Sequence, residues 1–377
     1  MLLIGVRLYA ENRPGIVEFA PENTRAVTVP AENGTSLQAN FNGQGPIHVV
    51  FDTGSSNIMS SSLAGKLGLS VGGTGSIDAM GGTVPAKGTV VDSVRIGRVT
   101  LHHQVFAVID LPSGADEEIA FIGDQWLQLL PIRIDFEHQR LTFYNPRFFH
   151  YSNKGSSLPI HFEKNAVIVE AAVDGIRGQF EIDSGSIHSL MLNAPFVTQH
   201  DLIRNYGATV RGYAGEGFGG QDTGLYTRAH ELRLSDLAVN LPITVLLEDT
   251  QGAGASHLAG NIGLRILKRF TIIFDGPKSR LYLEKSAAYN TPDIFNRAGL
   301  VVDPDPDNAR VRMVFPGSPA AEAGIVEDDV ITQIDGRPPT DDSLENAFLR
   351  APGTRLRLTV RHSETVLTVS IALRNVL

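Results

Sequence analysis

Short apolar segments that alternate with polar residues follow one another along the whole chain, and glycine-rich turns separate them. Alternation with a period of two is typical of strands that bury one face. Val, Ile, Thr and Phe, which are enriched in strands, recur in these segments. Helical stretches are brief, as in residues 125–130 and 264–269. The pattern therefore predicts a mainly β protein with a few short helices.

One part of this pattern occurs twice, with an offset of 140 residues. Residues 121–141 contain an apolar-apolar-Gly triplet, then an Asp 12 residues after that Gly, then an Arg 5 residues after the Asp. Residues 261–281 repeat the order and both spacings, with Asn261 as the first residue of the triplet. Self-similarity of this kind indicates a duplicated structural unit.

A second pair of matching segments lies upstream. Residues 49–55, with Asp52-Thr53-Gly54-Ser55, correspond to residues 180–186, with Asp183-Ser184-Gly185-Ser186. Each segment follows an Asn-Gly or Asp-Gly dipeptide that is typical of a two-residue hairpin. The chain is thus predicted to form two homologous β lobes, residues 1–148 and 149–288. A linker, 286–296, and a small α+β domain, 297–377, follow.

Composition excludes several functional classes. The formal net charge is −9 and no basic stripe is present, which argues against a nucleic-acid partner. The chain has no cysteine, so disulfides, thiolate catalysis and zinc–sulfur sites are excluded. Its apolar runs are too short to cross a bilayer. Residues 1–10 lack the basic start of a signal peptide. The compartment stays open, with the bacterial periplasm or secretion slightly favoured.

The paired Asp loops carry the candidate chemistry. Two close carboxylates cannot both ionise easily, so one acts as a base on water while the other keeps a proton, and no metal or cofactor is required. We expect Asp52 and Asp183 to form this pair. The neighbouring residues are expected to support it: Thr53 and Ser184 by hydrogen bonds to the opposite loop, Gly54 and Gly185 by tight turns, and Ser55 and Ser186 by hydrogen bonds to the outer oxygens. Serine support of both carboxylates predicts an acidic pH optimum.

Two acidic residues complicate this interpretation. Asp222-Thr223-Gly224 is a third such triplet, but Gly219, Gly220 and Gln221 precede it instead of an apolar strand. We expect it in the returning arm of a hairpin. Glu181 lies two residues before Asp183, where the first copy has Val50. On a strand it shares a face with Asp183, and its carboxylate would raise the proton affinity of the pair.

Residues 25–285 resemble the pepsin/retropepsin superfamily of aspartic peptidases, through Asp52-Thr53-Gly54-Ser55-Ser56-Asn57 and Phe121-Ile122-Gly123-Asp124. The resemblance implies a cleft between the lobes, an extended peptide or unfolded protein as substrate, and a β-hairpin flap. The flap is expected at residues 76–88 with Met80, Gly81 and Gly82 at its tip, although the tyrosine of pepsin-like flaps is absent. Residues 213–220 are the matching loop of the second lobe. With both lobes on one chain, a monomer is expected.

Residues 297–377 resemble a PDZ domain of the bacterial type, through Gly317-Ser318-Pro319-Ala320 and Ile334-Asp335-Gly336. Such domains add a peptide strand to a sheet edge and hold a terminal carboxylate in backbone N–H groups. Ala298, Gly299 and Leu300 are the candidate carboxylate loop. A structural cap without a ligand is the alternative.

Three functions remain open. The first is an aspartic endopeptidase whose PDZ-like module recruits or regulates substrate. The second is a non-catalytic peptide-binding scaffold with a degenerate protease fold. The third is an enzyme held closed until a ligand docks on the PDZ-like module.

Overall fold

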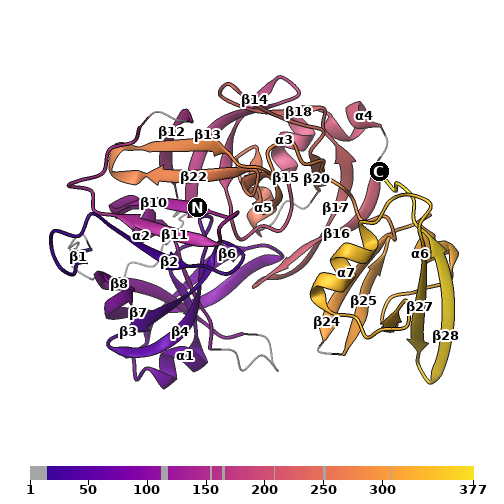
Figure 1. The fold of residues 1–377 in the computed structure, drawn as a ribbon, viewed down its shortest axis with the longest axis horizontal. Helices are drawn as coiled ribbons and strands as arrows, with labels where there is room; N and C mark the ends of the chain where they lie inside the picture. Colours follow the sequence, from indigo (N-terminus) through magenta and orange to yellow (C-terminus); the bar gives the residue numbers. More distant parts are fainter. Residues whose placement is uncertain are drawn as a thin grey trace.

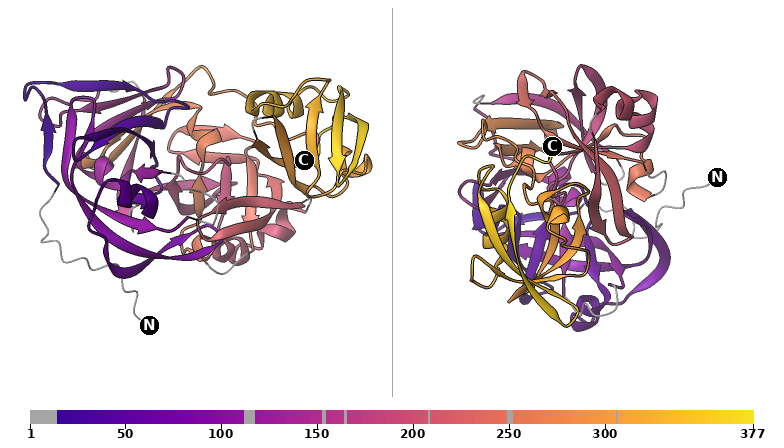
Figure 2. Two further views of the ribbon diagram at one scale, coloured as in Figure 1. Left: turned by 90° about the horizontal axis from the view of Figure 1, so that it is seen from below. Right: turned by 90° about the vertical axis from the view of Figure 1, so that its right-hand side faces the viewer.

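The structure, a computed structural model, describes residues 15–111, 118–152, 155–163, 166–207, 209–248, 252–305 and 307–377. Residues 1–10, where no signal peptide is predicted, lie outside this part. The described chain consists mainly of strands, as predicted, and forms two β lobes and a smaller C-terminal domain (Figures 1 and 2). No helix among the described residues is long and apolar enough to span a membrane.

Lobe one is built on an eight-stranded sheet with the order β1-β8-β5-β9-β4-β3-β7-β6. Alternating burial along these strands places one face of the sheet in a core that includes Phe41, Phe51 and Phe106. The elements of lobe one are β1 (Val17–Phe19), β3 (Ser36–Phe41), β4 (Gln44–Phe51), β5 (Ile58–Ser60), α1 (Ser61–Lys66), β6 (Gly72–Ala79), β7 (Gly82–Ile96), β8 (Val99–Ile109), β9 (Ala120–Ile122) and α2 (Asp124–Leu129).

Lobe two repeats this arrangement. Its strand β14 pairs in parallel with β21, as β4 does with β9 in lobe one. Its elements are β13 (Ala166–Val173), β14 (Ile176–Ile182), β15 (Leu190–Leu192), α3 (Ala194–Gln199), α4 (Leu202–Tyr206), β16 (Val210–Gly217), β17 (Gly220–Arg228), β18 (Glu231–Leu234), β19 (Leu237–Asn240), β20 (Ile243–Leu247), η1 (Gly252–Ala255), β21 (Gly260–Ile262), α5 (Leu264–Leu267) and η2 (Gly276–Lys278).

A run of six strands joins the lobes, in the order β12-β23-β22-β10-β11-β2. At its centre β10 and β22 pair antiparallel, and Arg133 lies opposite Ile273, the residue 140 positions later. Among the pairs of these two strands, this central one alone is separated by the repeat offset found in the sequence, so an approximate two-fold axis passes here and places the two Asp loops face to face. These strands are β2 (Ala26–Pro30), β10 (Pro131–Asp135), β11 (Arg140–Tyr144), β12 (Ser156–Glu163), β22 (Phe270–Asp275) and β23 (Arg280–Lys285).

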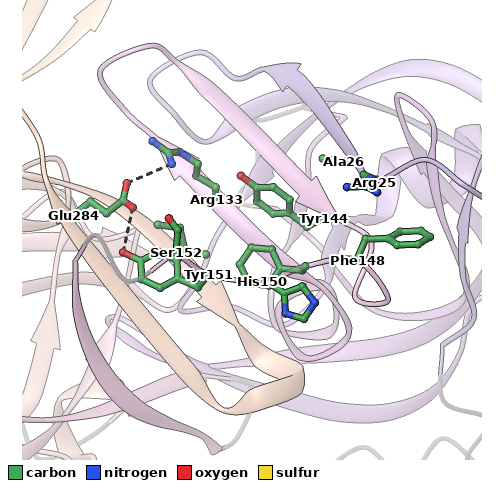
Figure 3. A pocket seen from close by; sticks show the side chains of 11 residues that line it. Arg25, Ala26, Arg133, Tyr144, Phe148, His150, Tyr151, Ser152 and Glu284 are labelled. Atoms are coloured by element: carbon green, nitrogen blue, oxygen red, sulfur yellow. Dashed lines mark hydrogen bonds and ion pairs between the residues drawn. The ribbon is translucent and has the colours of Figure 1, made fainter.

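A pocket lies over this seam (Figure 3). On its wall Arg133 forms an ion pair with Glu284 at 3.3 Å, and the Tyr151 hydroxyl donates to the same carboxylate at 3.1 Å. Neither Asp52 nor Asp183 lines this pocket. Its paired polar groups stabilise the joint between the lobes and are not part of the candidate active site.

The C-terminal domain has its own core and a five-stranded sheet with the order β24-β25-β26-β27-β28. Strand β24 extends to Asp305. Residues 286–296, expected to be a linker, contribute Phe295 to a cluster shared with lobe two. The elements are β24 (Leu300–Asp305), β25 (Asn308–Val314), α6 (Pro319–Glu322), β26 (Val330–Ile334), α7 (Asp341–Phe348), β27 (Arg355–His362) and β28 (Thr365–Ala372).

Candidate active site

Each Asp loop leaves the end of a buried strand. The amide of Asp52, directly after β4, donates to the carbonyl of Ile122 at 2.9 Å, and the amide of Asp183, directly after β14, donates to that of Ile262 at 3.1 Å. A glycine follows each of these isoleucines. A Cβ added to Gly123 would lie 1.8 Å from the Asp52 carbonyl oxygen. The repeated apolar-apolar-Gly triplet therefore leaves room for the loop that presents the aspartate.

The two carboxyl groups meet across the lobes. A Cβ added to Gly185 would lie 2.5 Å from Oδ2 of Asp52, and a Cβ added to Gly54 would lie 2.8 Å from Oδ1 of Asp183. Each aspartate thus rests over the glycine of the opposite loop, where any side chain would collide with it. The structure brings Asp52 and Asp183 into one site.

Two hydroxyls lock the loops together. The Thr53 hydroxyl donates to the Ile182 carbonyl at 2.7 Å and accepts from the Ser184 amide at 2.9 Å. The Ser184 hydroxyl donates to the Phe51 carbonyl at 3.2 Å and accepts from the Thr53 amide at 3.1 Å. Thr53 and Ser184 are both buried. The cross-loop hydrogen bonds expected from the sequence are therefore present in both directions.

The support of the carboxylates differs from the expectation in one respect. Backbone amides hold the oxygens: Gly54 donates to Oδ1 of Asp52 at 2.9 Å, and Gly185 and Ser186 donate to Oδ1 of Asp183 at 2.8 and 3.0 Å. The Ser55 hydroxyl instead donates to the Ser56 carbonyl, and that of Ser186 to the sulfur of Met191. The expected serine hydroxyl bonds to the outer oxygens are absent among the described contacts, because local acceptors take these hydroxyls.

Lobe two adds two polar side chains that lobe one lacks. The Asn261 amide donates to Oδ2 of Asp183 at 2.9 Å. Glu181 lies directly opposite Asn261 in the parallel pairing of β14 and β21, and a Cβ added to Gly54 would lie 3.0 Å from its Oε1. The corresponding pair in lobe one is Val50 and Phe121. Glu181 was noticed from the sequence, whereas Asn261 was missed, although its place in an otherwise apolar triplet was the available signal.

Burial and mutual repulsion hold protons in this cluster. Burial, followed by the charge of Asp52, raises the pKa of Asp183 to about 7 against the opposing amides of Gly185 and Ser186. Burial also raises the pKa of Asp52, while the amides of Gly54 and Gly185 oppose the shift. The pKa of Glu181 is raised well above its ordinary value by burial and then by Asp183 and Asp52. Such groups titrate together, and one shared proton between the aspartates is the state that persists toward neutral pH.

Two hairpins meet near the site, one from each lobe (Figure 1). The predicted tip Met80-Gly81-Gly82 joins β6 to β7, and the Met80 carbonyl accepts from the Gly219 amide at 3.1 Å. A Cβ added to Gly81 would lie 2.3 Å from the Gly220 carbonyl oxygen. Glycines on both hairpins therefore let the two backbones touch, and residues 213–220, expected as the matching loop of lobe two, lie in the second hairpin.

Each hairpin tip rests on the opposite lobe. Phe218 packs edge-to-face on Phe121 of lobe one, with ring centroids 5.5 Å apart, and Met80 packs against the cluster of lobe two that contains Met191 and Ala214. Asp222 lies on β17 opposite Gly215, in the returning arm predicted for it. The third triplet is thus part of a hairpin and not of an Asp loop.

The candidate carboxylate loop of the C-terminal domain is held by its own chain. The amides of Ala298 and Gly299 donate to Oδ1 of Asn296 at 3.0 and 2.9 Å, and the Asn296 amide donates to the Leu300 carbonyl at 2.6 Å. A ligand carboxylate at these amides would have to displace the Asn296 side chain.

Two parts of the chain match models of known protein families. Residues 37–123 match a family model described as aspartyl protease, and residues 310–362 match one described as PDZ domain. The chain carries an aspartyl protease domain and a PDZ domain. The protease match covers Asp52 and the tip of the first hairpin, and Asp183 is connected to it by the internal repeat.

Solved structures similar to the chain include an aspartic proteinase from Irpex lacteus, with 13% identity over 71% of this chain and 99% of that chain, at a TM-score of 0.46. They also include the HtrA3 PDZ domain bound to a phage-derived ligand (FGRWV), with 31% identity over 20% of this chain and 64% of that chain, at a TM-score of 0.17. No curated protein matches the chain.

Proposed function

We propose that the chain is an aspartic endopeptidase in which Asp52 and Asp183 activate one water molecule. The observation that carries this proposal is the contact of each aspartate with the glycine of the opposite loop, 2.5 and 2.8 Å from the position of a Cβ. Besides burial, the charge of Asp52 raises the pKa of Asp183, and two carboxyl groups that interact in this way share a proton in preference to ionising together.

The chemistry follows from that shared proton. The ionised carboxylate accepts a proton from the water as its oxygen attacks the peptide carbonyl carbon, and the protonated carboxyl donates its proton to the carbonyl oxygen. The diol then collapses: the carboxyl group that took the water proton gives it to the leaving nitrogen, the other carboxylate accepts a proton from a diol hydroxyl, and the carbon–nitrogen bond breaks to leave a carboxylic acid and an amine. The amides of Gly54, Gly185 and Ser186 fix the carboxylates throughout. The Thr53 and Ser184 hydroxyls keep the loops from separating.

The proposed substrate is an extended peptide or an unfolded protein. The tips of the two hairpins touch through their glycine backbones. The hairpins must therefore separate to admit a peptide substrate, and they can close over it once it is bound. Both halves of the site lie on one chain, which fits a monomeric enzyme.

The pH range of cleavage is expected to extend to near neutrality. The raised pKa of Asp183, about 7, keeps the shared proton in place up to that pH, and cleavage falls above it as the proton is lost. The acidic optimum predicted from serine support loses its main reason, because the serine hydroxyls bind elsewhere.

The test is cleavage of a denatured protein by the wild type, Asp52→Asn and Asp183→Asn, at pH values from about 3 to 8. Each variant is expected to lose cleavage by about 1000-fold or more, because one carboxyl group cannot act as both base and acid. Asp92→Asn is the matched control, since Asp92 is exposed on β7. Circular dichroism of all four proteins shows whether they are folded.

A non-catalytic peptide-binding scaffold is the second candidate, and the observations that favour it are the closed hairpins and the third carboxyl group. A folded wild type that binds denatured protein but does not cleave it at any pH would establish the scaffold. The same wild type becoming active only with a peptide on the PDZ domain would establish an enzyme held closed.

We further propose that the PDZ domain binds peptides and thereby recruits or regulates the substrate. The link to the protease part is Phe315, which lies just after β25. Its ring packs on Tyr226 of β17 at 5.5 Å between centroids, and a Cβ added to Gly212 of β16 would lie 2.1 Å from it. Through this contact, a peptide bound to the PDZ domain could affect the second hairpin, which β16 and β17 form. Fluorescence titration with free and amidated C-terminal peptides tests this proposal, and equal binding of both would contradict a carboxylate loop at 298–300.

A further inference from the structure

Glu181 is a third carboxyl group at the aspartate pair, and the catalytic scheme above does not use it. Its Oε1 and Oδ1 of Asp183 lie 3.0 and 2.8 Å from the same point, the Cβ position of Gly54. The two oxygens are therefore within about 6 Å of each other, close enough for one negative charge to disfavour the other. A carboxylate here would oppose the ionisation that the aspartates need.

Among the described residues, the charged groups that act on Glu181 include no cation. The strands that pair with β14 place Ile168 and Asn261 opposite it. The titratable groups that act on it are Asp183, at the end of its own strand, and Asp52, from the opposite loop. Both are acidic, so its surroundings favour the neutral acid. In agreement, burial and these two charges raise the pKa of Glu181 well above its ordinary value.

Asn261 supplies an independent observation. Its amide group donates to Oδ2 of Asp183, but its own Oδ1 is buried and has no hydrogen-bond partner within the described part of the chain. A buried acceptor without a donor is costly. Two oxygens, one from Asn261 and one from the neighbouring Glu181, can form a hydrogen bond only if a proton lies between them. A neutral Glu181 provides that proton.

Lobe one shows that the fold does not require either residue. Val50 and Phe121 occupy the same two positions beside Asp52, with the same parallel pairing. The polar pair is therefore an addition made to one aspartate only, which points to function and not to strand formation.

We propose that Glu181 is a positioning residue that stays protonated in the active enzyme, donates its proton to a hydrogen bond with Oδ1 of Asn261, and so holds the Asn261 amide on Asp183. A neutral carboxylic acid used as a hydrogen-bond donor is an established device in enzyme sites. The inference rests on the proposed peptidase function.

The test compares two substitutions at Glu181. Glu181→Gln keeps a neutral donor of the same shape, so kcat and both limbs of the pH profile are expected to stay within about 3-fold and about 0.3 pH units of wild type. Glu181→Val, which copies lobe one, removes the donor. It is expected to lower kcat about 10-fold with KM within about 2-fold, because orientation of Asp183 is lost. Its alkaline limb should move to higher pH, because Asp183 loses a hydrogen bond that favours its ionised form and so keeps the shared proton to a higher pH.

Asn261→Leu removes the other member of the proposed hydrogen bond. It should reproduce the kinetics of Glu181→Val, and the double variant should be no slower than either single one, because both act through one hydrogen-bonded chain. Equal losses in Glu181→Gln and Glu181→Val would overturn the proposal, as would wild-type kinetics in Glu181→Val.

A measurement that does not need turnover separates this inference from the peptidase proposal. Infrared spectroscopy of the wild type at neutral pH should show a protonated carboxylic acid band that Glu181→Gln lacks. An ionised Glu181 at that pH would overturn the inference even if the enzyme is active. If the wild type shows this band but none of the proteins cleaves substrate, the result would support a protonated Glu181 and contradict the peptidase function.

Discussion

Lobe one surrounds its aspartate with apolar side chains, whereas lobe two surrounds the other with polar ones. Beside Asp52 the strand pair presents Val50 and Phe121, and beside Asp183 it presents Glu181 and Asn261. The residue directly after the glycine of each repeated triplet shows the opposite difference. Here lobe one has a polar residue, the buried Asp124, and lobe two has an apolar one, Leu264. The backbone was thus kept in both copies while the polar positions diverged. Two aspartates related by a repeat need not be chemically equivalent, and a difference between them lets one act as base while the other holds the proton.

The largest expected effect comes from the loop glycines, where the lobes are alike. Gly185→Ala places a methyl group 2.5 Å from Asp52, and Gly54→Ala places one 2.8 Å from Asp183 and 3.0 Å from Glu181. Each should lower kcat/KM by about 1000-fold or more, because the carboxyl groups are pushed out of their shared geometry. Kinetics of peptide cleavage checks this prediction.

Gly65→Ala is the control for both glycine variants, since a Cβ there has no neighbour within 4 Å. It should leave cleavage unchanged. Gly54→Ala, which crowds two carboxyl groups, should be the worse of the two loop variants. Near-normal activity in either would mean that the loops do not meet as described.

The next largest effect tests the carboxyl group that only lobe one has. Burial raises the pKa of Asp124 to about 7, and its Oδ1 has no hydrogen-bond partner among the described residues. A folded-state pKa raised above the unfolded value contributes stability at low pH that is lost as pH rises through about 7. Asp124→Asn should therefore gain free energy of unfolding at about pH 8, by up to about 4 kcal/mol, and gain nothing near pH 4.

Urea unfolding of Asp124→Asn and wild type at both pH values measures this difference. Asp92→Asn, at an exposed site, should show no pH-dependent gain. A gain of equal size at pH 4 and pH 8 would show that hydrogen bonding, and not the buried charge, is responsible.

A smaller effect is expected where both lobes contribute the same group. Thr53→Val and Ser184→Ala each remove a buried hydroxyl that makes two cross-loop hydrogen bonds. Each should lower the free energy of unfolding by about 2 kcal/mol, because buried partners are left unsatisfied. Thr53→Ser keeps the hydroxyl and should cost less than about 1 kcal/mol. Urea unfolding checks these values, and a much larger loss from one loop than from the other would show that the lock is not symmetric.

The parts of the site that the sequence predicted are those under steric or periodic constraint. Gly54, Gly185 and the two aspartates recur with matching neighbours because any side chain at the glycines would collide with a carboxyl group. The pairing of the seam was not predicted, because an offset of 140 residues fits antiparallel pairing about any residue of the strand and does not fix where the two-fold axis lies.

Other features depended on local competition that no spacing records. Whether the Ser55 and Ser186 hydroxyls reach a carboxylate or a nearer acceptor is a choice of side-chain rotamer, and here the nearer acceptors win. Asn261 was read as an imperfect match to Phe121, since one polar residue in an apolar strand does not reveal its partner. The sequence did not indicate that β24 extends to Asp305, because prolines and aspartates disfavour strands in general.

The smallest expected effect concerns the two hairpins, which differ in how their glycines are constrained. Gly81 has a φ of 80° and so resists substitution on conformational grounds alone, whereas Gly219 has no such constraint. A Cβ on Gly219 would still lie 2.4 Å from the Gly82 amide nitrogen. Gly219→Ala therefore tests contact between the tips without straining the turn. It should raise KM about 5- to 10-fold with kcat nearly unchanged, because the two hairpins close less completely over the bound peptide.

Gly72→Ala, in the same hairpin as Gly81 but with no neighbour within 4 Å of its Cβ position, should not change KM. If Gly219→Ala binds and cleaves as the wild type does, then the tips part in the substrate complex, and each hairpin contacts the peptide from its own side without the other.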